Sequence, residues 1–476
     1  MNTKPLISIL IGACIIGCGD DDDNNPNPDP VMIQQPLTYT FASRFQDGQS
    51  SVAYSGQTKR NLLIESIKKY IGGLTDQTFQ NPTEGDVVDA LTFFYDFKNA
   101  GATDQTAIGF LTGTTPPLQT EWGELGSLAS LKEKFPEFDA NFTGTVIGYD
   151  DGSMTPETAL LDMFTKLEGL IIARANGTIP QDPSGADISA PYVSAEGVDY
   201  QQLIQKYLSG TIQISQGTDD YLDDDIEGKG LLSDNDAAAS ERPYTALEHV
   251  WDEGFGYFGA ARNYGDYTDE EISAKGGREA WQGANDADND GSINLLSEYN
   301  FGHSVNASKR DLGSVVATDF SKDAFDAFLA GRTLIVNAGA DLTAAQLAEL
   351  QGYRDTAVGA WEKAVAATAV HYVNEVLQDM NDFGTAEYDF LAHAKHWSEL
   401  KGFALALQFN VNHSPMTTSD MTQLQGYIGA RPVLPSDDAT AQTDYRAALI
   451  SARDLLGNVY QFAADNLGDM NGENGW

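Results

Sequence analysis

The longest uninterrupted helical pattern in the sequence covers residues 343–380, TAAQLAELQGYRDTAVGAWEKAVAATAVHYVNEVLQDM. Apolar residues recur in it at helical spacing, no proline interrupts it, and it is far longer than a typical β-strand. Similar patterns recur along the chain, at residues 56–74, 86–98, 157–176, 198–214, 244–264, 322–336, 387–409 and 443–467. Segments that alternate apolar and polar residues are few. The sequence therefore predicts an all-α protein.

These helices are expected to form an antiparallel bundle, because an amphipathic helix must bury its apolar stripe against other helices. A chain of 476 residues with 41% hydrophobic residues is long enough for a large core. Long loops rich in Gly, Pro, Asp and Asn are predicted near 101–156, 176–195 and 219–243. Two helices with histidine and carboxylate motifs, near 243–262 and 386–410, could be the halves of a duplicated bundle.

The first residues resemble a bacterial lipoprotein signal. Residues 1–17 combine a basic start with an apolar stretch that is too short to span a membrane permanently. The string Ile15-Ile16-Gly17-Cys18 resembles a lipobox, in which cleavage precedes a cysteine that receives lipid such as palmitate. The other cysteine, Cys14, lies inside the signal, so the mature chain cannot form an internal disulfide. The alternative is an ordinary signal peptide or a buried apolar N-terminus.

Residues 18–38 are expected to be a disordered tether, because the acidic and proline-rich stretch GDDDDNNPNPDP cannot bury surface. Residues 39–476 would then form a single folded domain, attached to the membrane through the N-terminal lipid. In the lipoprotein resemblance, an Asp after the lipidated cysteine favours the inner membrane. Here that position is Gly19, which implies the outer membrane of a Gram-negative bacterium. Whether the body faces the periplasm or the cell surface stays open.

The formal net charge of −42 narrows the class of partner. Phosphate backbones and anionic lipid surfaces would repel such a chain, so we expect no nucleic-acid partner. Cations are the favoured ligands, and protein partners stay unknown. The alternative explanation for most of these carboxylates is solubility in a salty habitat, where charge repulsion is screened.

The string DADNDGSINLLSE at residues 286–298 predicts a calcium loop. Its oxygen-bearing residues fall at the alternate positions of the EF-hand consensus, with a glycine at the bend. The predicted ligands are Asp286, Asp288, Asp290, Ser292, Asn294 and Glu298. Position twelve is Ser297, so the glutamate comes one residue late, as in dockerin-like loops. A lone loop of this kind favours a structural calcium ion, and the alternative is a metal-free turn that caps the next helix.

Two groups of histidine and carboxylate residues are candidates for a transition-metal site holding iron or zinc, or for a polar core. Their members are His249, Asp252 and Glu253, and His393, His396 and Glu399. A helical wheel places His393 and His396 on an apolar stripe with Glu399 at its border, whereas the first group lies opposite its helix's apolar stripe. His371 is interpreted as a surface histidine. For each histidine alone, a structural hydrogen bond is the ordinary alternative.

No catalytic residue can be assigned from these patterns. The zincin motif HExxH, the nucleophile elbow GxSxG, a phosphate-binding glycine loop and a mature cysteine nucleophile are all absent from the sequence. The sequence therefore leaves enzymatic activity uncertain and leans against it.

Several long strings resemble a family of bacterial lipoproteins that carry one domain of unknown function. They are YTFASRFQDGQSSVAYSGQTKRNLLIESIKKYI, HVWDEGFGYFGAARNY, DADNDGSINLLSEYNFGHSVNASKRDLGS and AKHWSELKGFALALQFN. That family is distantly similar to the imelysin-like proteins, whose hallmark is GxHxxE. Here His396 and Glu399 supply HxxE, with Ala394 in the glycine position, and His249 with Asp252 gives HxxD.

The resemblance implies an imelysin-like helical bundle of two halves and a link to iron acquisition, with peptidase activity described for some members. The leading hypothesis is a lipid-anchored, non-enzymatic protein that binds a transition metal through the two histidine groups. One alternative is a metallopeptidase, in which a carboxylate acts as general base beside a metal-bound water. Another is a structural surface protein in which these residues only satisfy one another.

Overall fold

The computed structural model describes residues 32–75, 82–98, 105–108, 115–126, 129–137, 142, 144–273 and 285–476. These residues contain helices and isolated β-bridges but no β-strand, which confirms the predicted all-α class. The α-helices are α1 (Ser55–Gly72), α2 (Asp86–Tyr95), α3 (Pro156–Ala175), α4 (Tyr200–Leu208), α5 (Ala246–Phe258), α6 (Asp269–Ser273), α7 (Gly302–Leu312), α8 (Phe320–Ala338), α9 (Ala344–Asn381), α10 (Phe390–Ala406), α11 (Thr418–Ile428), α12 (Ala439–Tyr460) and α13 (Ala464–Leu467). The predicted signal, Cys18 and most of the predicted tether lie outside the described residues.

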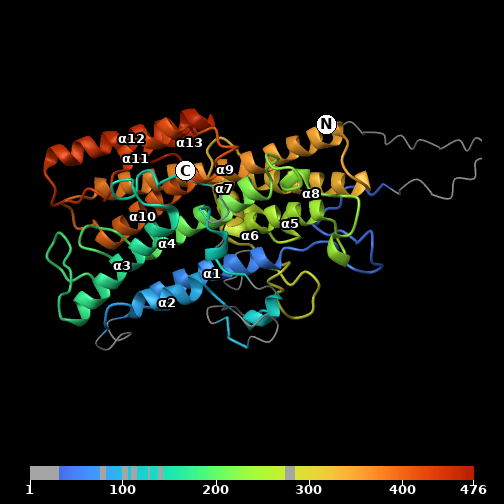
Figure 1. The fold of residues 1–476 in the computed structure, drawn as a ribbon. Helices are drawn as coiled ribbons and strands as arrows, with labels where there is room; N and C mark the ends of the chain where they lie inside the picture. The colour runs from blue at the N-terminus through green and yellow to red at the C-terminus, as the bar shows by residue number, and fades with distance from the viewer. Residues whose placement is uncertain are drawn as a thin grey trace, which may run out of the picture.

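Helix α9 is the longest helix in the described residues, and several other helices pack against it. Its 38 residues correspond to a length of about 57 Å at the standard helical rise. It begins with a capping box, in which the side chains of Thr343 and Gln346 satisfy each other's backbone N–H groups. Helices α7, α8, α10 and α12 all pack against it. Figure 1 shows α9 running along much of the molecule, with α8 toward one end and α10 toward the other.

Helix α4 continues into a buried π-helix, Ser209–Asp220. The predicted helix at 198–214 thus exists and extends six residues further, but in a wider turn that periodicity does not predict. Two glycines let neighbouring helices approach it. A Cβ at Gly210 would lie 2.5 Å from the Cα of Ala406, and one at Gly217 would lie 2.6 Å from the ring of Trp361. π-Helical turns are rare and often occur at functional sites.

Besides the five-residue α6, two helices were not predicted, α7 and α11. Both are short and polar, so their apolar spacing is weak, and they are stabilised by packing against α6, α8 and α9, or α12. The described parts of the predicted long loops contain isolated β-bridges and short 3₁₀ turns, the latter at Trp122–Leu125, Lys132–Lys134, Gly230–Leu232 and Ala239–Glu241. In the part of the chain that is described, no helix is both long enough and apolar enough to span a membrane.

Candidate functional site

The predicted calcium loop is a tight acidic turn. One carboxylate oxygen each from Asp286, Asp288 and Asp290 lie within 4.8 Å of one another, and no other trio of His, Cys, Asp or Glu in the described residues gathers so closely. Asp286 also shapes the turn, because its oxygens accept hydrogen bonds from the backbone N–H groups of Asp290 and Gly291 at 2.9 and 2.8 Å. Gly291 has a φ of 91°, which favours glycine. The backbone N–H of Ser292 donates to Asp290 Oδ1 at 2.8 Å.

Glu298 is a buried residue whose side chain connects the two ends of this loop. It is only 5% exposed. Its Oε1 accepts a hydrogen bond from the Ala287 N–H and its Oε2 accepts one from the Asn294 N–H, both at 2.7 Å. The late glutamate therefore holds the two ends of the loop together through backbone contacts, which gives it a structural role whether or not it also contacts a cation.

The loop also attaches a distant segment to the body. Ile293 is 1% exposed and forms a parallel bridge with Pro117. The Leu118 N–H donates to the Ile293 carbonyl at 2.8 Å, and Gln119 Nε2 donates to Asn294 Oδ1 at 3.0 Å. A change in the loop would therefore reach residues 116–119, more than 160 positions earlier in the chain.

His249 and Glu253 in α5 lie together near the surface. His249 Nδ1 is 2.9 Å from the Ala53 carbonyl oxygen, and its Nε2 is 3.8 Å from Glu253 Oε2. The imidazole stacks on Tyr244 with ring centroids 4.6 Å apart. Glu253 Oε1 accepts a hydrogen bond from Gln57 Nε2 at 2.8 Å. Burial raises the pKa of Glu253 above its usual value, against the opposing effect of His249.

Asp252 belongs to a different group, centred on Arg332 of α8. Arg332 Nε donates to Asp252 Oδ1 at 2.8 Å, and Arg332 Nη1 donates to Glu248 Oε1 at 3.1 Å. All three side chains are fully buried. Asp252 also accepts hydrogen bonds from the Tyr39 hydroxyl at 2.8 Å and the Ala53 N–H at 3.0 Å. Both oxygens of Asp252 are thus held by protein donors, and Arg332 supplies the opposite charge.

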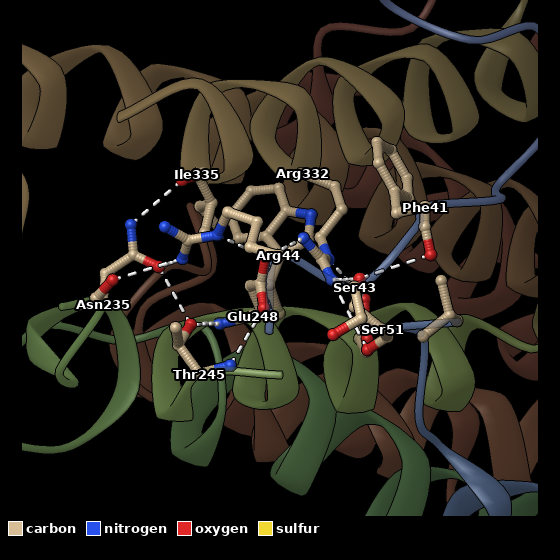
Figure 2. A network of polar contacts seen from close by, with 12 residues as sticks. Phe41, Ser43, Arg44, Ser51, Asn235, Thr245, Glu248, Arg332 and Ile335 are labelled. Carbon is tan, nitrogen blue, oxygen red and sulfur yellow. Dashed lines mark hydrogen bonds and ion pairs between the residues drawn. The ribbon is translucent and has the colours of Figure 1, made fainter. Parts of the chain in front are cut away.

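The same network joins the segment before α1 to α5 and α8. Arg332 Nη2 donates to Ser51 Oγ at 2.8 Å, and Arg44 Nε lies 3.4 Å from Glu248 Oε1 (Figure 2). The Thr245 N–H donates to Glu248 Oε2 at 2.9 Å, so Glu248 also caps the start of α5. Burial disfavours the charged guanidinium, but Asp252 and Glu248 outweigh burial and hold the pKa of Arg332 above its usual value.

The histidines of α10 face carboxylates of α9. His396 Nδ1 lies 2.9 Å from Asp379 Oδ2, and His396 Nε2 lies 3.6 Å from Glu375 Oε2. His393 Nδ1 is 3.6 Å from the same oxygen of Asp379. His371 Nε2 is 3.9 Å from Glu375 Oε1. These five side chains alternate imidazole and carboxylate along the α9–α10 interface, and we call them the histidine ladder.

Burial and charge act in opposite directions within the histidine ladder. Burial lowers the pKa of His396, but its hydrogen bond to Asp379 and the charge of Glu375 outweigh burial and raise that pKa above 6.5. Burial raises the pKa of Asp379, yet the two neighbouring histidines reverse the effect and lower it. His393 is fully buried, and its Nδ1 makes no hydrogen bond within the described residues. His393 Nδ1 therefore lies 3.6 Å from the Asp379 carboxylate without forming a hydrogen bond to it.

Glu399 has a separate partner. Its Oε1 lies 3.4 Å from Nζ of Lys206 in α4, and both side chains are at least nine-tenths buried. Burial raises the pKa of Glu399, but Lys206 outweighs it and lowers that pKa. Burial lowers the pKa of Lys206 to about 7. The His of the HxxE string thus pairs with carboxylates of α9, whereas its Glu pairs with Lys206 of α4 and also interacts with Tyr372 of α9.

The two predicted histidine groups have separate surroundings. Within the described residues, no hydrogen bond or ion pair links His249, Asp252 or Glu253 to the predicted residues of α10. The sequence patterns did not identify Glu375 and Asp379. The available signal was their spacing with His371, because residues 371, 375 and 379 follow one another at i+4 steps on a single face of α9.

A comparison with protein families finds one match. A family model described as "Domain of unknown function (DUF4856)" matches residues 172–425. No curated protein and no solved structure matches the chain. The family match confirms the predicted domain of unknown function, whereas the lipoprotein and imelysin resemblances stay predictions. The matched range includes α5, the acidic loop and the histidine ladder.

The Arg332 network leads to a stability prediction. Replacing Arg332 with leucine should lower the free energy of unfolding by about 3–5 kcal/mol, because it leaves the buried Asp252 without a counter-charge and the buried Glu248 with Arg44 alone. Adding Glu248→Gln and Asp252→Asn to that variant should recover part of the loss, since the unpaired charges are then gone. Chemical denaturation followed by circular dichroism measures both changes.

Lys322→Ala provides the matched control, since Lys322 also lies in α8 but is 62% exposed and forms its ion pair with the exposed Asp326. It should change the free energy of unfolding by no more than about 1 kcal/mol. An Arg332→Leu protein as stable as this control would contradict a structural role for the network.

Proposed function

The chain belongs to the DUF4856 family of domains of unknown function, and we propose that it is a lipid-anchored, cation-binding protein of the bacterial cell envelope. In this proposal the acidic loop holds a structural Ca²⁺ ion and the histidine ladder holds a transition-metal ion. The observation that carries cation binding is the gathering of three carboxylates in the acidic loop. The envelope location rests on the sequence resemblance of residues 15–18 to a lipobox.

Cys18 is the proposed lipid attachment site. Cells that express the chain in a Gram-negative host and are fed radiolabelled palmitate should label the wild-type protein and not Cys18→Ser. Cys14→Ser is the matched control and should keep the label, because Cys14 would be removed with the signal. Equal labelling of the Cys18→Ser protein would exclude this anchor. Fractionation of the labelled cells tests the outer-membrane location separately.

A bound Ca²⁺ ion would relieve the charge repulsion within the acidic loop. Three carboxylates within 4.8 Å repel one another, and a hard cation between them removes that repulsion. The Gly291 bend and the Glu298 contacts already organise the backbone around this position. Because Ile293 bridges to Pro117, calcium in the loop would also stabilise the attachment of residues 116–119.

Calcium should therefore stabilise the protein. A lone loop of this type binds with a dissociation constant on the order of 10⁻⁴–10⁻³ M. At about 10–100 times that concentration, Ca²⁺ should add about 1.4–2.7 kcal/mol to the free energy of unfolding. Thermal denaturation with Ca²⁺ and with a chelator measures the shift, which the double variant Asp286→Asn with Asp290→Asn should abolish.

Two exposed aspartates of α12 provide a control of equal charge. The double variant Asp444→Asn with Asp454→Asn should keep the whole calcium-dependent shift. If both double variants lose it equally, calcium acts through the general charge of the surface and not through the loop.

The histidine ladder is the proposed transition-metal site. Imidazole and carboxylate ligands together suit Zn²⁺ or iron better than Ca²⁺. The fully buried His393 has a ring nitrogen without a hydrogen bond, 3.6 Å from the carboxylate that His396 also contacts. An ion between His396, Asp379 and His393 would satisfy that nitrogen and shield the carboxylate. It requires rotation of these side chains, because they do not already place three ligand atoms within 4.8 Å.

Zn²⁺ titrated into metal-free protein should bind through this site, and His396→Ala should weaken binding by about 10–100-fold. Binding should also weaken as the pH falls from 8 to 6. The metal needs neutral imidazole, and because the pKa of His396 is raised, this histidine takes up its competing proton at a higher pH than an ordinary histidine does. Isothermal titration calorimetry at the two pH values measures both effects.

His249→Ala is the matched control, because His249 also contacts a glutamate at i+4 but lies outside the ladder. It should leave Zn²⁺ affinity unchanged. Equal affinity in the wild-type and His396→Ala proteins would leave the ladder as a structural ion-pair series.

A further inference from the structure

A cavity of about 520 Å³ lies among α6, α7, α8 and the segment at residues 35–37. Small-molecule sites in proteins commonly have volumes of about 300–1,000 Å³. None of the residues that line it belongs to the acidic loop or to the histidine ladder. It therefore forms a separate candidate site, at the place where the described chain begins.

The lining of this cavity carries an excess of negative charge. Among the described residues, its carboxylates are Asp266, Asp269, Asp319 and Asp326, and its one basic residue is Lys322. Lys322 is already paired with Asp326. The side chains of Asp266 and Asp319 make no ion pair with the described residues. Lys322 is thus the shared counter-charge, because it pairs with Asp326 and its charge also acts on Asp319.

Asp269 adds a partly buried carboxylate on the same side. Its Oδ1 accepts a hydrogen bond from Ser321 Oγ at 3.1 Å. Burial and the nearby charge of Asp311 raise the pKa of Asp269 above its usual value. A cation in the cavity would offset both effects, since it restores a favourable environment for the ionised carboxylate.

Aromatic rings form the apolar part of the wall. Tyr264 and Phe325 are buried, with ring centroids 5.5 Å apart, and Tyr267 lines the cavity beside them. Aromatic faces attract cations and also bury apolar groups. The carboxylates do not gather three ligand oxygens within 4.8 Å, so their arrangement suits an extended cation better than a bare metal ion.

We propose that this cavity binds a small organic cation, a protonated amine joined to an apolar body. The ammonium group would lie near Asp266 and Asp319, and the apolar body would pack on Tyr264 and Phe325. This site is independent of the two metal sites, so its success or failure leaves them untouched.

The full chain can be tested with 2-phenylethylamine and with 3-phenylpropanoate, a ligand of similar size and opposite charge. Isothermal titration calorimetry in calcium-free, low-salt buffer should show binding of the amine at least about tenfold tighter than of the anion, a difference of about 1.4 kcal/mol. Asp266→Asn with Asp319→Asn should weaken amine binding by about tenfold. Phe325→Leu should also weaken it, through the lost ring.

Asp323→Asn is the control, because this exposed aspartate lies in α8 between Asp319 and Asp326 but does not line the cavity. It should keep full affinity for the amine, and every variant should keep the wild-type circular dichroism spectrum. The proposal is overturned if the amine gives no binding heat, if the anion binds as well, or if the double variant binds the amine like wild type. Displacement of the amine by Mg²⁺ at equal concentration would instead identify an inorganic cation site.

Discussion

The neutralisation of buried charge at Arg332 is the interaction on which the α5–α8 end of the bundle depends. A guanidinium removed from water is costly unless carboxylates approach it and its donors are satisfied. Glu248 and Asp252 from α5 meet it, and Ser51 from the segment before α1 accepts a further donor. Because these partners come from α5 and from the segment before α1, while Arg332 lies in α8, the network fixes the relative positions of three elements, which apolar packing alone specifies less precisely.

The cost of burying an unpaired charge also explains why charged and polar side chains pair with one another between other helices of this protein. Glu399 meets Lys206 across α10 and α4, and His396 meets Asp379 across α10 and α9. These contacts are all polar, but they differ in how many of the buried hydrogen-bonding atoms have a partner. Asp252 has donors on both oxygens, whereas His393 keeps one ring nitrogen without a hydrogen bond. An incompletely satisfied buried group is where an added ion gains most, so the histidine ladder is a better candidate for metal binding than the Arg332 network.

Sequence periodicity predicted most helices, because a helix that buries one face must repeat its apolar residues at 3.6 positions. It placed α9 within one residue at each end. It missed α7, whose polar sequence is helical because of its neighbours, and the π-helix, whose backbone departs from that period. For the candidate sites, the local acidic loop could be predicted since its residues are close in sequence. The partners of Asp252 and His396 could not, because Arg332 and Asp379 are brought to them by tertiary packing.

The distribution of basic residues strengthens the case for cations at the surface. Several of the 28 lysines and arginines are buried in the described residues, among them Lys59, Lys206, Arg310, Arg332, Arg354, Lys401 and Arg453. Positive charge used inside the bundle cannot balance carboxylates outside it, so the exterior is poorer in basic groups than the composition alone indicates. Cavities in such a surface concentrate cations through the summed field. Bulk salt screens that field beyond about 10 Å at 0.1 M, but it screens partly buried carboxylates such as Asp269 much less. Enclosed acidic sites should thus retain cations where the open surface does not.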